Sequence, residues 1–243
     1  MRYFHLPVLI FIFFLACATS CKKSSSATGV NVNNEFKYKI ATVHYVGNLG
    51  IQDYRFVYNA QGQVDSIFGP VGITIFSYTP TVINVTIDST SGGIYRYNMY
   101  TNANGSVTQI NAPDTTFLSY NSENELNTYK VLYAGGGTEI DRYTWINGEI
   151  DSVVYSNGYP SENTSRRYFY NLGYFSQPGD PLSISDFITY GRTIIRSQHL
   201  MIGSSNSLDL NIAYKFDTLH RITQLTMSGD LVIATFSYTY TTN

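Results

Sequence analysis

Cysteine is nearly absent from this chain of 243 residues, where Cys17 and Cys21 are the only two and both lie near the start. A domain built from the later residues therefore holds no disulfide and no thiolate metal site. Beyond Cys21 the histidines are His44, His199 and His220, and no two of them have the three-to-five spacing of a zinc site. We therefore expect neither a metal nor a cofactor.

Catalytic motifs are also lacking. The sequence contains no Gly-x-Ser-x-Gly, Ser-x-x-Lys or His-Glu-x-x-His pattern, no phosphate-binding glycine loop and no calcium loop. Charged residues make up 13%, with 15 basic and 17 acidic side chains and no long run of either sign, so a basic face for nucleic acid is not expected. We expect a protein that is not an enzyme. A hydrolase whose active site is assembled from distant residues, with His199 beside a Ser or Asp, stays as an alternative.

Long apolar runs are missing apart from one near the start, between Val8 and Ala16. This run is too short to cross a bilayer, which takes roughly 20 residues, and it is typical of a signal peptide over residues 1–20. The small residues that follow resemble the junction of a bacterial lipoprotein, in which the cysteine after the cleavage site is acylated. Cys21 is the favoured lipid attachment site and Cys17 the alternative. A plain secretory leader is the remaining interpretation.

The stretch over residues 21–35 is polar and small, and predicts a flexible tether. Several acyl chains on Cys21 would hold the protein firmly to a membrane. The junction "SCKKSSS" resembles lipoproteins of the Bacteroidota, which implies the outer membrane. Surface-exported members usually carry acidic residues after the cysteine, whereas this chain has Lys22 and Lys23, so the periplasmic face is favoured over the cell surface.

Strand-forming residues are plentiful, including 22 tyrosines. Tyr54, Phe56 and Tyr58 alternate with Arg55 and Val57, and the turn residues "NAQG" follow directly. This pattern predicts an all-β protein.

The hairpin pattern recurs along the chain. The segments "FVYNAQGQVDSIFG" (56–69), "FLSYNSENELNTY" (117–129) and "AYKFDTLHRITQLTM" (213–227) share one spacing, and "MYTNANGSVTQI" and "YTWINGEIDSVVY" differ from it by one residue in the turn. Within the third copy, "FDTLHRITQL" resembles the tyrosine-aspartate repeat of RHS-like proteins and of Bacteroidota lipoproteins that carry degenerate copies. Phe216 and His220 depart from the tyrosine and glycine of that motif. The resemblance implies a fold and a location, and no reaction.

Successive hairpins predict one β domain over residues 36–243. Because large antiparallel sheets twist and curl, we expect a large curved sheet, an open or incomplete barrel. A transmembrane barrel is disfavoured by the polar residues on both sides of many strands. An irregular or short helical insertion is expected near residues 174–206, with Ser183 and Ser185 as possible caps. It is expected to act less as a lid than as a source of core residues, namely Phe187, Ile188, Ile194 and Ile195.

Five aspartates are followed by a Ser or Thr and then an aliphatic residue or Thr. This pattern resembles the acceptor for O-glycosylation in Bacteroidota, although strand alternation alone can also generate it. The candidate acceptors are Ser66, Ser89, Thr115, Ser152 and Thr218.

The function expected from these features is that of a membrane-anchored envelope lipoprotein that acts as a binding or scaffold module. Its candidate aromatic surface is Tyr95, Tyr97 and Tyr100, because tyrosine offers a large contact area with a polar tip. A glycan or an envelope protein is the expected partner. The alternatives are a carrier of a lipid or other hydrophobic molecule, with a cavity on the concave face of the sheet, and the hydrolase mentioned above.

Overall fold

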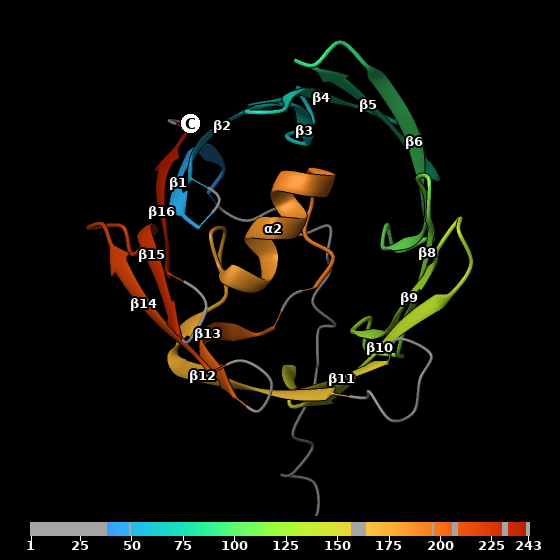
Figure 1. Cartoon of the computed structure of the whole chain (residues 1–243). Coiled ribbons are helices and arrows are strands. Elements are labelled where there is room, and N and C mark those ends of the chain that lie inside the picture. Colours follow the sequence, from blue (N-terminus) through green and yellow to red (C-terminus); the bar gives the residue numbers. More distant parts are fainter. Residues whose placement is uncertain are drawn as a thin grey trace, which may run out of the picture.

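The structure is a computed structural model, and it describes residues 38–48, 50–156, 164–195, 197–205, 209–229 and 233–241. In these residues sixteen strands form a closed barrel in which each strand is antiparallel to both neighbours, and a helix, α2 (Pro181–Tyr190), lies inside the ring (Figure 1). The signal region, the tether, Cys17 and Cys21 lie outside the described residues. Among the described residues, no helix is long and apolar enough to cross a membrane.

The strands follow one another round the barrel in chain order, and β1 closes the ring against β16. The strands are β1 (Ile40–Gly47), β2 (Gly50–Tyr58), β3 (Val64–Gly69), β4 (Gly72–Tyr78), β5 (Val82–Ser89), β6 (Ile94–Thr101), β7 (Val107–Asn111), β8 (Thr115–Tyr120), β9 (Leu126–Leu132), β10 (Thr138–Ile146), β11 (Glu149–Ser156), β12 (Thr164–Phe175), β13 (His199–Ser205), β14 (Leu210–Phe216), β15 (Ile222–Gly229) and β16 (Ile233–Tyr240).

The predicted all-β architecture of successive hairpins is confirmed, and the expectation of an open sheet is wrong. The first and last strands pair over most of their length, from Ile40 with Tyr240 to Gly47 with Ala234. On the outer face of this seam the hydroxyls of Thr42 and Thr239 lie 2.7 Å apart. Closure removes the two unpaired edges that an open sheet of this size would expose.

The outer face of the wall carries both polar and apolar side chains. One row of cross-strand partners on this face runs through Ser77, Asn84, Asn98, Asn111 and Thr115 on five neighbouring strands. Exposed charged residues also point outward around the wall, namely Asp53, Arg55, Asp88, Arg96, Arg142, Arg167 and Lys215. Exposed apolar side chains interrupt this pattern on the same face, among them Ile51, Ile75, Ile94, Phe117 and Ile233.

The inner face carries the core. Wall residues such as Phe56, Phe76 and Leu225 are at most 4% exposed, and they form one cluster with Ile184 of α2 and with Ile194. The ring of Phe187 lies 5.1 Å from that of Phe56. The insertion therefore supplies core residues, as predicted: Ile194 is buried, and Phe187, Ile188 and Ile195 pack against the core.

The helix has different boundaries from those expected. It begins at Pro181, whose fixed φ suits the first helical position, and the N–H of Ile184 donates to the carbonyl of Asp180 at 2.9 Å. The expectation of Ser183 or Ser185 as a cap is wrong, since both lie within the helix. Gly191 ends it at φ 67°, with its N–H donating to Phe187 O.

An aromatic bulge beside a repeat turn as candidate functional site

The repeated hairpins place their turns at one end of the barrel, here called the repeat end. Four of these turns use the same hydrogen bonds. A side-chain Oδ1 accepts from the N–H groups two and four residues later, and the residue three positions on has a positive φ. The accepting residues are Asn59, Asn102, Asn121 and Asp217, and the positive-φ residues are Gly62, Gly105, Asn124 and His220. The recurring sequence pattern is therefore explained by one turn geometry.

The aromatic residues of the repeat have a second role at this end. In five hairpins a β-bulge lies at the second or third residue of the second strand, and a bulge disrupts the ladder of backbone hydrogen bonds. An aromatic donor from the following strand bonds the carbonyl of the residue at the bulge, as Tyr120 does with Val107 at 2.7 Å. The other donors at bulged hairpins are Tyr78 to Val64, Trp145 to Leu126, Tyr170 to Ile150 and Tyr240 to Ile222. Tyr58 and Tyr214 make equivalent bonds to Ile40 and Met201.

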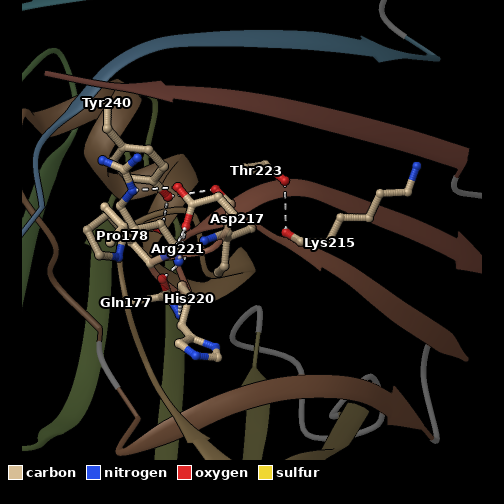
Figure 2. A network of polar contacts seen from close by, with 10 residues as sticks. Gln177, Pro178, Lys215, Asp217, His220, Arg221, Thr223 and Tyr240 are labelled. Carbon is tan, nitrogen blue, oxygen red and sulfur yellow. Dashed lines mark hydrogen bonds and ion pairs between the residues drawn. The ribbon is translucent and has the colours of Figure 1, made fainter. Parts of the chain in front are cut away.

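The fourth copy of the repeat turn, residues 217–221, holds the chain where it leaves the wall for the interior (Figure 2). The side-chain amide of Gln177 donates to His220 O at 3.2 Å and accepts from the N–H of Ile222 at 3.1 Å. Asp217 accepts from Arg221 Nε at 2.6 Å. Desolvation raises the pKa of Asp217, but the hydrogen bonds from Arg221 and Leu219 outweigh it and lower the pKa overall.

Directly before Gln177, strand β12 bulges out of the wall. Asn171 pairs with Leu200, and Phe175 pairs with the adjacent residue of β13, His199. The three residues of β12 between them therefore have no pairing partner in β13. Leu172 is 73% exposed and Phe175 is 70% exposed. We call residues 172–175 the aromatic bulge. Bulges of this kind re-aim side chains and are common beside functional sites.

Two ring stacks support the aromatic bulge. Tyr174 stacks on Phe216 with ring centroids 4.8 Å apart at 9°, and Phe175 stacks on His199 at 5.1 Å and 19°. The bulge is thus an apolar surface that packs against the end of β14 and the start of β13. An exposed apolar patch on a fixed scaffold is typical of an interaction site.

His199 also forms a short hydrogen bond through Nδ1 with Oε1 of Glu149, and both side chains are largely buried. Burial raises the pKa of Glu149, and its hydrogen bonds with His199 oppose that rise. Such a pair could orient a catalytic base. However, the hydroxyl of Ser197 donates to the carbonyl oxygen of His199, 2.8 Å away, and so is directed to the backbone instead of the ring.

The sequence-predicted aromatic surface is divided between the two faces of β6. Tyr95 and Tyr97 pair with the inward residues Ile87 and Val85, whereas Tyr100 lies on the outward face opposite Gln109. Tyr95 is 60% exposed, and Tyr97 is half-buried against α2 with its hydroxyl 3.4 Å from Thr189 O. The structure does not bring the three rings together. The run "YFYNLGYF" before Gln177, with a glycine inside a strand pattern, was the available signal for the aromatic bulge.

The five candidate acceptors for O-glycosylation are scattered. Thr218 is exposed in the turn at the repeat end, and Ser66 is only 8% exposed in β3. Ser89, Thr115 and Ser152 are half-buried on β5, β8 and β11. Modification of any of them stays a prediction, with Thr218 the most accessible.

No group of three His, Cys, Asp or Glu side chains in the described part of the chain is placed to hold a metal ion.

The sequence matches no protein-family model and no curated protein. Similar solved structures exist. A porin-like protein from Bacteroides uniformis ATCC 8492 has a TM-score of 0.64 at 11% identity, with 83% of this chain and 98% of that chain covered. A porin-like protein from Bacteroides vulgatus ATCC 8482 has a TM-score of 0.58 at 12% identity, covering 85% and 100%. At this identity the likeness concerns the barrel fold alone.

Proposed function

We propose that this chain is a lipid-anchored binding protein of the cell envelope, whose barrel presents the aromatic bulge to a partner. The observation that carries the proposal is the exposure of Leu172 and Phe175 where β12 departs from the register of β13, beside two ring stacks that hold the aromatic bulge in place. Its partner is a glycan or an envelope protein. A sugar ring or an apolar peptide surface can stack on such aromatic side chains.

The envelope location is supported by the signal-like first 20 residues and by the two similar barrels from Bacteroides. Acylation of Cys21 and a position at the periplasmic face of the outer membrane belong to the same proposal. Mass spectrometry of the protein from its own membranes should find the acyl groups on Cys21, and they should disappear in Cys21→Ser and persist in Cys17→Ser.

A binding role is favoured over the two alternatives, a carrier of a hydrophobic molecule and a hydrolase, by the position of helix α2 and by the contacts of His199. Helix α2 lies inside the barrel and its Ile184 belongs to the buried core cluster, so part of the interior that a hydrophobic cargo would use is taken by the chain itself. The ring of His199 is hydrogen-bonded to Glu149 through Nδ1 and is stacked on Phe175, and the hydroxyl of the neighbouring Ser197 donates to the backbone. A non-catalytic role therefore fits the described contacts best.

A photo-crosslinking amino acid at Leu172 tests the proposal in the native cells. We expect an adduct with a glycan or an envelope protein, and loss of that adduct when Tyr174 and Phe175 are both replaced by Ala. The matched control is the same crosslinker at Asn84, an exposed residue of the outward face. An absence of adducts at Leu172, or equal adducts at both positions, would contradict the proposal.

A further inference from the structure

A second feature of the barrel is a buried acidic side chain on the inner wall, Asp141 of β10, which is separate from the aromatic bulge of β12. This residue is 8% exposed, and its Oδ1 has no hydrogen-bond partner among the described residues. Burying a carboxylate without a partner is costly, so the wall holds an acceptor that a ligand can satisfy.

Tyrosines surround this carboxylate. Its direct cross-strand neighbours are Tyr129 on β9 and Tyr155 on β11, so three adjacent strands point these side chains to the same inner face. Tyr143 follows two positions along β10 on that face. The hydroxyl of Tyr155 in turn lies 3.1 Å from that of Tyr168 on β12.

The surroundings favour a positive charge. Glu139 is the next inward residue of β10 toward the β9–β10 hairpin, at the end of the barrel opposite the repeat end, and its Oε2 accepts a hydrogen bond from Tyr133. A ligand approaching from that end would pass this second carboxylate before it meets Asp141. The guanidinium of Arg166, an inward residue of β12, lies 5.5 Å from the ring centroid of Tyr155, so the protein's own cation already contacts this ring, and a ligand would share the ring with it.

We propose that Asp141, Tyr129, Tyr143 and Tyr155 form a binding site for an organic ammonium group on the inner wall. The carboxylate would form an ion pair with the ammonium group or accept a hydrogen bond from its N–H. The aromatic faces would stabilise the cation, as in aromatic cages for methylated amines. The number of carboxylates is too small for a metal site, because no group of three potential ligands is found among the described residues. The site is independent of the proposed function at the aromatic bulge.

The experiment is a calorimetric titration of the folded chain from residue 22 onward with tetramethylammonium chloride and, separately, with putrescine, at pH 8. We expect saturable binding that weakens at least about tenfold in Asp141→Asn, which keeps the shape and removes the charge. Asp88→Asn is the matched control, because Asp88 is an exposed acid of the outer wall. Circular dichroism and thermal unfolding verify that each variant is folded.

Three results would overturn the site. The first is no saturable binding of either ammonium probe to the wild-type chain. The second is equal binding by Asp141→Asn and wild type. The third is displacement of the ammonium probe by glucose at similar concentration, which would mean that the wall recognises hydroxyl groups in place of charge. None of these results bears on crosslinking at Leu172, so the two proposals fail separately.

Discussion

The ring of Phe76 on β4 closes over Gly191, the residue that ends helix α2. A Cβ placed on Gly191 would lie 2.8 Å from Cζ of Phe76, and the φ of Gly191 is 67°. Both facts require glycine there. The contact fixes where the chain turns after the helix inside the barrel.

Gly191→Ala should therefore destabilise the protein by about 2–4 kcal/mol, through backbone strain together with overpacking against Phe76. Urea unfolding measures the change. Gly135→Ala is the control, because Gly135 has open space around its Cβ position and no positive φ, and a change within about 0.5 kcal/mol is expected there. Equal effects of the two substitutions would show that the contact with Phe76 is not tight in solution.

His220→Gly should stabilise the protein. His220 occupies a positive φ of 58° at the position where Gly62 stands in the equivalent turn. Relief of left-handed strain exceeds the entropy cost of glycine by about 0.5–1 kcal/mol. The hydrogen bond from Gln177 is kept because it uses the backbone carbonyl of residue 220. The reverse change, Gly62→Ala, should destabilise, and an opposite sign for either variant in thermal unfolding would refute the shared turn geometry.

Tyr120→Phe removes the hydroxyl that bonds the carbonyl of Val107 at a bulge. A half-buried carbonyl then loses its partner, so the free energy of unfolding should fall by about 1–2 kcal/mol. Tyr100→Phe, on the outward face, should change it by less than about 0.5 kcal/mol. If both variants unfold at the same urea concentration as the wild type, the ring of aromatic donors does not stabilise the repeat end.

The pH dependence of stability should reflect two carboxyl groups inside the barrel. Burial, with a smaller effect of Glu139, raises the pKa of Asp141 to about 6. Burial raises the pKa of Asp186 to about 7, against the hydrogen bonds from the N–H groups of Ile195 and Ile194. Both pKa values lie above those of the unfolded chain, so the folded state binds more protons. The stability that these two groups contribute is therefore fully present below about pH 4, and it is lost as the pH rises through 6 and 7.

Asp141→Asn separates the contribution of that residue. The variant should be more stable than the wild type by about 1–2 kcal/mol at pH 8, and nearly equal to it at pH 4, where Asp141 is already neutral. Asp217 has the opposite sign: its lowered pKa makes a contribution that is lost only as the pH falls below its usual value near 3.8. Urea titrations at pH 4, 6 and 8 give the comparison. A difference between variant and wild type that does not change with pH would contradict the assignment.

The hairpins were readable from the sequence because their information is local. Asn59 and Gly62 specify a turn by their own side chain and backbone, and alternation such as Tyr54, Phe56, Tyr58 specifies which residues share a face. The core residues of the insertion were found for the same reason, as an apolar run that must be buried. The aromatic surface at Tyr95, Tyr97 and Tyr100 was misjudged as one patch, because the spacing from 97 to 100 places Tyr100 on the other face of β6.

The sequence by itself determined the strands, the turn chemistry of the repeat and the content of the core, since each depends on neighbours a few residues apart. Only the tertiary structure decided that the sheet closes, because the pairing of Val43 with Tyr238 joins residues at opposite ends of the chain and has no local signature. The same is true of the aromatic bulge and of the site at Asp141. Phe175 is exposed because β12 departs from the register of β13, and Asp141 is enclosed because two other strands place tyrosines beside it. Register between strands is set by the whole barrel, and it is register that assembles these sites.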